Sequence, residues 1–209
     1  MLRYTLEGVH GLLQPDKDWT YTKKREAQEI IPGLWLGPFG AARDREFLGR
    51  AGITDVLVVR APEEARIIAP KYPDVIRYEV LECRDSPFES IIVHFPTVKA
   101  MVDGILSRGG RILVHDNAGL SSSAAIVIAY VMDTHSITAD EAYYYVYTRR
   151  QCINVNTGFR KQLREYEVLR KVNSVAFVPN PAGAHGQKRP LEISPLRLPF
   201  PAILPLEQS

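Results

Sequence analysis

Ten residues near the middle of the chain read Val114-His115-Asp116-Asn117-Ala118-Gly119-Leu120-Ser121-Ser122-Ser123. The apolar run at 111–114 predicts a short strand. The stretch 123–133 predicts a central, buried helix, because it is apolar on nearly every side. A strand, a short loop with a glycine and a helix together point backbone N–H groups inward, which creates a site for an anion. This turn occurs in many α/β proteins, so alone it is weak evidence for a phosphate site.

Strands and helices alternate on both sides of this loop. Apolar patterning predicts strands at 34–36, 53–59 and 75–81. It predicts helices at 43–50, 91–106 and 157–171, with Pro96 kinking the early turns of the second. A further helix should start at Thr138, where Thr138-Ala139-Asp140-Glu141 forms a capping box. This order predicts an α/β fold, with a central, mostly parallel sheet flanked by helices.

Composition narrows the class of protein. The 209 residues include 26 basic and 24 acidic side chains, so the formal charge of +2 indicates neither a nucleic-acid partner nor a membrane surface. No apolar run approaches the roughly 20 residues that span a bilayer, and the N-terminus lacks a signal-peptide pattern. Cys83 and Cys152 form no metal or disulfide pattern. We therefore expect an intracellular protein, in the cytoplasm, the nucleus or both.

Three segments are expected along the chain. Residues 1–25 form an N-terminal extension, 26–172 the single folded domain, and 173–209 a proline-rich tail. The tail holds seven prolines, which disfavour helices and central strands, and we expect it to be disordered.

The loop at 115–123 resembles the signature of cysteine-based protein phosphatases, His-Cys-x-x-Gly-x-x-Arg-Ser. His115, Gly119 and Ser123 match it. The resemblance covers about residues 19–171: 28–37 looks like the opening strand of dual-specificity phosphatases, 52–57 like their next strand, and 149–159 like the segment that leads into their last helix. Within that family, residues 19–21 before 24–26, the Asn117-Ala118-Gly119 loop and 152–154 look most like the STYX type, the serine/threonine/tyrosine-interacting pseudophosphatases.

The resemblance implies a cysteine-phosphatase-like fold and assigns three catalytic roles. In active members a cysteine thiolate attacks phosphorus, an arginine binds two phosphate oxygens, and an aspartate protonates the leaving oxygen. Here Asp116 replaces the cysteine and Ser122 replaces the arginine, whereas Asp85 keeps the position of the acid. STYX-type proteins typically carry glycine in place of the cysteine and keep the arginine, so this chain departs further from the active pattern.

We therefore expect no functional catalytic residue, a vestigial general acid at Asp85, no metal and no cofactor. The degenerate phosphate loop comprises His115, Asp116, Asn117, Ala118, Gly119, Leu120, Ser121, Ser122 and Ser123. We expect His115 to have a structural role. The Asp116 carboxylate either folds into the N–H groups of the loop or caps the following helix from outside. Its charge would repel a phosphate about 4 Å away by roughly 4 kcal/mol at an effective dielectric constant of about 20, or about three orders of magnitude in affinity.

Three functions are compatible with the sequence. The first is an inactive scaffold or competitor that binds proteins of signalling pathways, such as kinases or phosphoproteins. The second is an active protein phosphatase with a non-standard nucleophile, and Asp116 itself is one candidate. The third is a structural relic within a larger complex. Turnover of an aryl phosphate separates the second from the other two.

Overall fold

The computed structural model describes residues 17–175, with side-chain surroundings up to residue 172. The proline-rich tail predicted from residue 173 lies, beyond Val175, outside the described residues. The domain boundaries predicted at residues 25 and 172 stay predictions. The last helix continues to Val175.

A five-stranded sheet forms the centre of the domain, in the order β1-β2-β5-β3-β4. The strands are β1 Gln28–Ile31, β2 Leu34–Pro38, β3 Asp55–Arg60, β4 Arg77–Glu82 and β5 Ile112–Asp116. All pairs are parallel except β1 with β2. The predicted α/β fold with a mostly parallel sheet is therefore confirmed.

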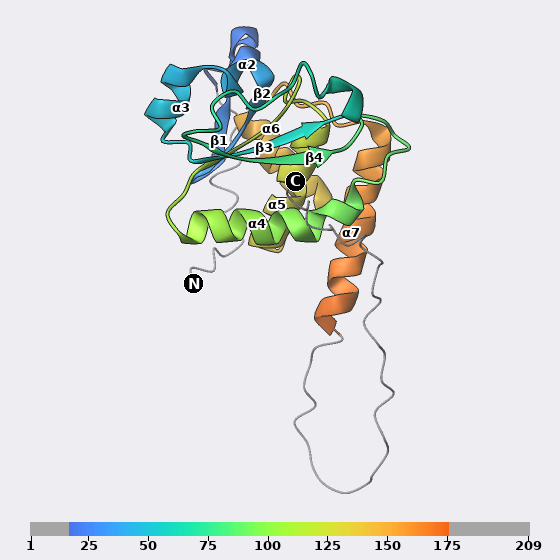
Figure 1. Ribbon diagram of the computed structural model, residues 1–209. Helices are drawn as coiled ribbons and strands as arrows, with labels where there is room; N and C mark the ends of the chain where they lie inside the picture. Colours follow the sequence, from blue (N-terminus) through green and yellow to red (C-terminus); the bar gives the residue numbers. More distant parts are fainter. Residues whose placement is uncertain (1–16, 176–209) are drawn as a thin grey trace, which may run out of the picture. The chain divides into compact units, whose positions relative to one another are not determined.

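Helices cover both faces of the sheet (Figure 1). They are α2 Phe39–Ala42, α3 Arg45–Ala51, α4 Phe95–Ser107, α5 Ser122–His135, α6 Ala139–Arg149 and α7 Thr157–Val175, with 3-10 turns η1 Tyr21–Arg25, η2 Pro62–Glu64 and η3 Ile92–His94. Successive side chains of a strand point to opposite faces. In β3, Leu57 and Val59 therefore join one apolar core with α4 to α7, and Val56 and Val58 join another with α2 and α3.

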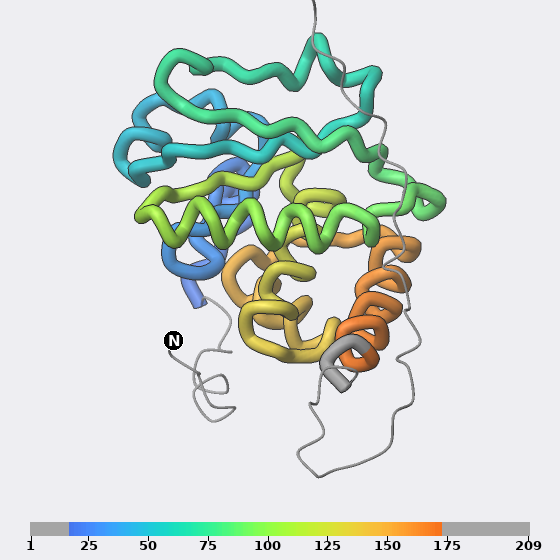
Figure 2. The backbone as a smooth tube through the Cα atoms, turned by 60° about the horizontal axis from the view of Figure 1, so that its bottom comes forward, coloured from blue at the N-terminus to red at the C-terminus, as the bar shows by residue number. Residues whose placement is uncertain are grey.

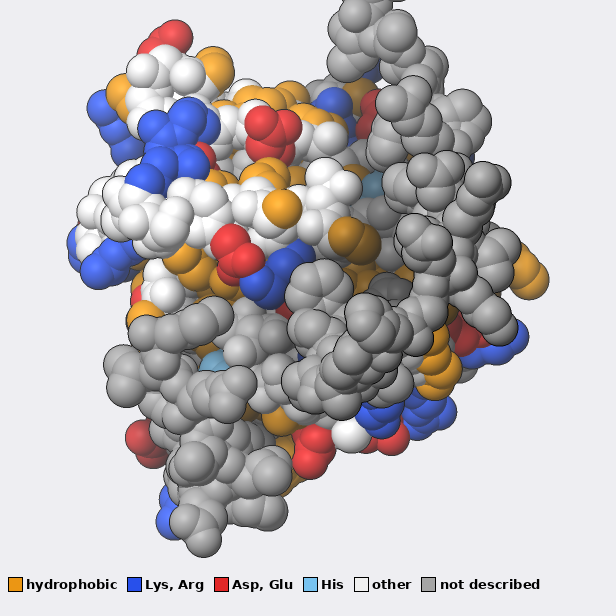
Figure 3. All heavy atoms as spheres, turned by 90° about the horizontal axis from the view of Figure 1, so that it is seen from below, with side chains coloured by type: hydrophobic (Ala, Val, Ile, Leu, Met, Phe, Trp, Pro, Cys, Tyr) orange, Lys and Arg blue, Asp and Glu red, His pale blue; other side chains and the backbone are white. Residues whose placement is uncertain are grey.

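The predicted buried helix is α5, in which every residue from Ser122 to Met132 is buried. Figure 2 shows α4 lying along the sheet, with α5, α6 and α7 beyond it. Figure 3 looks at the molecule from below Figure 1, and acidic and basic side chains lie interspersed with hydrophobic ones there.

The ends of the helices follow from local chemistry. Asp44 caps α3 by accepting a hydrogen bond from Phe47 N at 3.0 Å, and Gly52 ends it in the left-handed region at φ 64°. The predicted capping box of α6 is present. The helix predicted at 91–106 begins later, since a 3-10 turn at Ile92–His94 precedes α4. Because α4 begins at Phe95, Pro96 lies in its first turn, where the missing N–H interrupts no helical hydrogen bond.

The stretch 28–37, expected as one opening strand, is a hairpin of β1 and β2. It turns at Gly33, whose φ of 85° suits glycine. The four-residue helix α2 was not predicted, since one turn is too short for a periodic pattern. It places Phe39 beside the degenerate phosphate loop, where Phe39 N donates to Asn117 O at 3.2 Å.

Candidate functional site

The degenerate phosphate loop lies where β5 ends and α5 begins. His115 and Asp116 are the last residues of β5, and α5 starts at Ser122. β5 extends beyond its predicted end because it pairs with β2 as far as Asp116, opposite Pro38. α5 begins before its predicted start and ends after its predicted end. The carboxyl end of a parallel strand is where α/β proteins commonly bind ligands.

One oxygen of Asp116 accepts backbone N–H groups from within the loop. Oδ1 accepts from Ala118 N at 2.8 Å and also from Gly119 N. The carboxylate therefore lies inside the turn and takes the donors that an anion would otherwise use.

The other oxygen of Asp116 binds the start of α5. Oδ2 accepts from Ser123 N at 3.0 Å, from Ser123 Oγ at 2.7 Å and from Ser122 Oγ at 3.1 Å. Ser122 and Ser123 are both buried. A negative charge at a helix N-terminus is favourable. Of the two conformations left open by the sequence, the structure has the one in which the carboxylate folds into the loop.

Arg150 binds the carbonyl groups of the two loop residues whose N–H groups bind Asp116. Its side chain is 0 % exposed. Nε donates to Gly119 O at 2.8 Å and Nη2 to Ala118 O at 3.1 Å. The N–H groups of residues 118 and 119 thus bind Asp116, whereas their carbonyl groups bind Arg150.

The other donors of Arg150 bind the N-terminal part of the chain. They reach Lys24 O at 3.1 Å, Glu26 O at 2.8 Å and the side-chain oxygen of Gln28. All five N–H hydrogens of the guanidinium therefore have acceptors. Burial lowers the pKa of Arg150, and the Asp116 charge opposes that shift. This role could not be predicted from the sequence, because two arginines adjoin at 149–150 and only the tertiary contacts show which one is buried.

Gly119 is required by the close approach of its neighbours. Its φ is 69°, and a Cβ there would lie 2.5 Å from the carbonyl of Gly37 and 2.8 Å from Nη2 of Arg150. Any side chain at this position would separate the loop from both.

His115 is buried and directed into the protein. Its Nδ1 lies 3.1 Å from Asp116 O, and its ring stacks on Phe39 with centroids 5.9 Å apart. Burial lowers the pKa of His115, so the neutral imidazole is favoured. These contacts are those of a side chain that fixes the end of β5.

Asp85 reaches the loop from the segment between β4 and η3. Its Oδ1 accepts from Ser121 Oγ at 2.6 Å and from Asn156 Nδ2 at 2.7 Å. Asn156 N donates in turn to Ser121 Oγ at 3.1 Å. The three residues come from three parts of the chain and connect the loop to the start of α7. The sequence-predicted site residues therefore lie together, although Asp85 is engaged in a structural network.

Neither cysteine is suited to act as a nucleophile. Burial raises the pKa of the Cys83 thiol to about 12, and nearby carboxylates, including Asp116, add to that shift. Burial also raises the pKa of Cys152. A thiol must ionise to attack phosphorus, and both remain protonated at neutral pH.

The described part of the chain also bears on metal binding and membrane insertion. Between residues 17 and 175, no group of three or more His, Cys, Asp and Glu side chains could hold a metal ion. In the same range no helix combines the length and the apolar character that a membrane span requires.

Comparison with known proteins places the chain among phosphatase domains. The family described as "Dual specificity phosphatase, catalytic domain" matches residues 34–168. Serine/threonine/tyrosine-interacting protein B of Xenopus laevis is 49% identical over 155 residues, which cover 73% of this chain and 70% of the relative. Dual specificity protein phosphatase 1B of Arabidopsis thaliana is 35% identical over 143 residues, which cover 68% of this chain and 83% of the relative.

Two solved structures also resemble this chain in fold and sequence. The crystal structure of the human tyrosine phosphatase-like serine/threonine/tyrosine-interacting protein matches with a TM-score of 0.69 and 47% identity, covering 70% of this chain and 99% of that one. The crystal structure of human DUSP28 matches with a TM-score of 0.63 and 30% identity, covering 69% of this chain and 95% of that one.

Proposed function

The chain belongs to the dual specificity phosphatase family, and we propose that it is a pseudophosphatase, which keeps the fold but does not hydrolyse phosphate esters. One observation carries the proposal. The carboxylate of Asp116 accepts hydrogen bonds from the N–H groups of residues 118, 119 and 123, the groups that would hold a phosphate.

The chemistry of the loop supports inactivity in two further ways. A carboxylate stands where the thiolate nucleophile would be, and Ser122 offers one hydroxyl where a guanidinium would bind two phosphate oxygens. That hydroxyl already donates to Asp116. An incoming phosphate would therefore meet a negative charge and no compensating cation from position 122.

The alternative is an active phosphatase with Asp116 as the nucleophile. Such a reaction needs a carboxylate oxygen that can approach phosphorus. Both oxygens of Asp116 accept hydrogen bonds from the loop or from α5, so attack would require that network to break. The geometry favours the inactive protein.

The protein-binding part of the proposal draws on the relatives. Several are named serine/threonine/tyrosine-interacting proteins, and a domain without catalysis can still present its surface to a partner. We propose that this chain is a scaffold or competitor for kinases or phosphoproteins, within the cytoplasm, the nucleus or both. Proximity labelling with the full chain would separate this role from that of a structural relic, which would recover only subunits of one assembly.

A turnover assay tests the loss of catalysis. The purified full chain is incubated with an aryl phosphate and with a doubly phosphorylated kinase peptide, and phosphate release is measured. We expect no release above that of buffer. Release that disappears in an Asp116→Ala variant would establish the alternative.

A further inference from the structure

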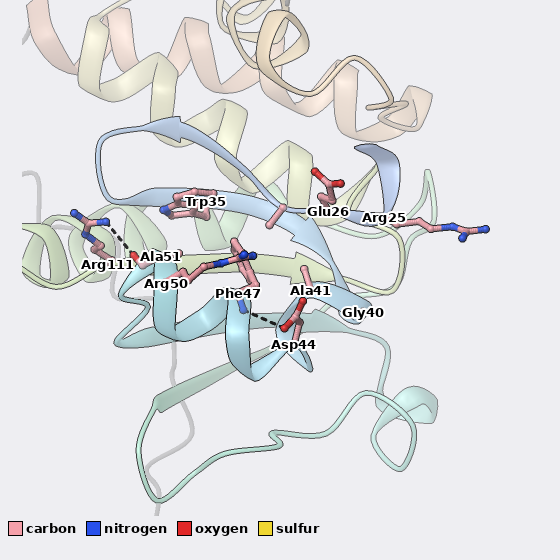
Figure 4. A pocket seen from close by; sticks show the side chains of 11 residues that line it. Arg25, Glu26, Trp35, Gly40, Ala41, Asp44, Phe47, Arg50, Ala51 and Arg111 are labelled. Atoms are coloured by element: carbon pink, nitrogen blue, oxygen red, sulfur yellow. Dashed lines mark hydrogen bonds between the residues drawn. The ribbon is translucent and has the colours of Figure 1, made fainter. Parts of the chain in front are cut away.

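A cleft of about 510 Å³ lies away from the degenerate phosphate loop. Residues from the η1–β1 segment, β2, α2, α3 and the start of β5 line it, and Figure 4 shows them. Its volume falls within the roughly 300–1,000 Å³ of typical ligand sites. We call it the arginine-rimmed cleft, after Arg25, Arg50 and Arg111 around the aromatic pair Trp35 and Phe47.

The middle of the cleft is aromatic and open. Trp35 and Phe47 meet edge to face, with ring centroids 5.4 Å apart. A Cβ on Gly40 would have no heavy atom within 4 Å, so the wall formed by α2 leaves space there. An apolar or aromatic side chain of a partner would fit against the two rings.

The indole N–H of Trp35 is an unused donor. It is buried and has no hydrogen-bond acceptor among the residues that the structure describes. Buried indole N–H groups usually find a partner. In Figure 4 the nitrogen lies on the side of the ring that faces Arg111, whose long side chain can move. A bound peptide that displaces the Arg111 side chain would bring one of its own carbonyl oxygens to the indole N–H of Trp35.

Positive charge outweighs negative charge around the cleft. Three arginines line it, against the carboxylates of Glu26 and Asp44, and Asp44 is already used as the cap of α3. Arg50 pairs with the exposed Glu46 at 3.4 Å, and such surface pairs are weak. Arg111 donates through one nitrogen to Ala51 O at 2.9 Å, which leaves its other donors for a ligand. A guanidinium with free donors can bind a carboxylate, for which its planar fork is well suited.

We propose that the arginine-rimmed cleft binds an acidic linear segment of a partner protein. In Figure 4, Arg25 and Arg111 lie at opposite ends of the cleft with the aromatic pair between them; Glu26 stands beside Arg25, whose side chain extends outward. An extended peptide with a central apolar residue and acidic residues on both sides matches that order of charge and apolar surface. The inference deepens the proposed binding role by naming the chemistry of one partner segment, and it involves no residue of the degenerate phosphate loop.

A synthetic peptide tests the proposal. Fluorescein-labelled Glu-Asp-Leu-Phe-Asp-Glu is titrated with the full chain, and fluorescence polarisation is measured at low and at raised salt. We expect saturable binding that weakens with salt. The double variant Arg25→Glu/Arg50→Glu should weaken it by about tenfold or more, because attraction becomes repulsion at both exposed positions. Trp35→Phe should weaken it as well.

Controls separate this site from unspecific attraction. Arg66→Glu reverses an exposed arginine that does not line the cleft, and it should leave the affinity unchanged. A peptide with lysine in place of each acidic residue should not bind. The proposal is overturned if the wild type does not bind the acidic peptide, if Arg25→Glu/Arg50→Glu binds as well as the wild type, or if Arg66→Glu is equally impaired. Tighter binding of a labelled single-stranded oligonucleotide, lost in the double variant, would also overturn it. The phosphatase assay tests the loss of catalysis separately, because the cleft and the degenerate phosphate loop share no residue.

Discussion

At the scale of single residues, two positions carry the proposed loss of catalysis. Asp116 brings a charge and two acceptor oxygens to the backbone N–H groups of the loop, and Ser122 adds one more donor to that carboxylate. The two replacements are therefore connected physically, because the side chain at position 122 donates to the carboxylate at position 116. Replacing Asp116 alone removes the acceptor but supplies no cation to hold a phosphate.

Repair of the loop should need both positions. Asp116→Cys alone should give little turnover of an aryl phosphate, because no guanidinium binds the phosphate oxygens. Asp116→Cys with Ser122→Arg should give measurable turnover, since the backbone of the loop is already in place. Members of one catalytic unit act non-additively, so the double variant should exceed the sum of the singles.

The single variant Ser122→Arg is the matched control for that repair. It should remain inactive, because its guanidinium would pair with Asp116 and no thiolate is present. Equal activity in Asp116→Cys and in the double variant would show that this account of Ser122 is wrong.

At the scale of elements, Arg150 connects the degenerate phosphate loop to η1 and β1. Its side chain binds carbonyl groups of Ala118 and Gly119 and of residues 24 and 26. Arg150→Met should lower the free energy of unfolding by about 3 kcal/mol or more, because several buried carbonyl acceptors would lose a charged donor. Urea denaturation measures this change.

An exposed arginine provides the comparison for Arg150. Arg160 lies on α7 and donates to Tyr143 Oη at the surface. Arg160→Met should cost less than about 1 kcal/mol. If the two variants lose similar stability, the loop does not depend on its contacts with Arg150.

Sequence patterns predicted the helices and strands in which the apolar residues follow one clear pattern. The β-branched run of β3 and the apolar α5 were recognisable because burial on both faces, or on all sides, leaves a continuous apolar stretch. The hairpin at Gly33 and the single turn of α2 were missed, since each is shorter than a repeating pattern. In the site, the resemblance located residues 115–123 and Asp85. It did not reveal Arg150 or Asn156, because their contacts join residues 31 and 71 positions apart.

At the scale of the whole molecule, α7 is the last element that the structure describes. The 34 residues after Val175 contain all seven prolines of the predicted tail and no apolar periodicity. Removing residues 176–209 should therefore leave the melting temperature within a few degrees of that of the full chain. Differential scanning calorimetry of both proteins checks this, and a fall of about ten degrees or more would mean that the tail stabilises the domain.

Asp116 accepts hydrogen bonds from three N–H groups of the loop and α5, and we propose that it thereby occupies the anion site. Vanadate binding tests it most directly, because a ligand that binds only the folded protein raises the melting temperature in proportion to RT ln(1 + [L]/Kd). Vanadate at about millimolar concentration should not shift the wild type beyond a matched salt control. Asp116→Gly should give a small shift and Asp116→Gly with Ser122→Arg a larger one, since a negative charge is removed and a bidentate cation is added. A specific shift already present in the wild type would contradict the account.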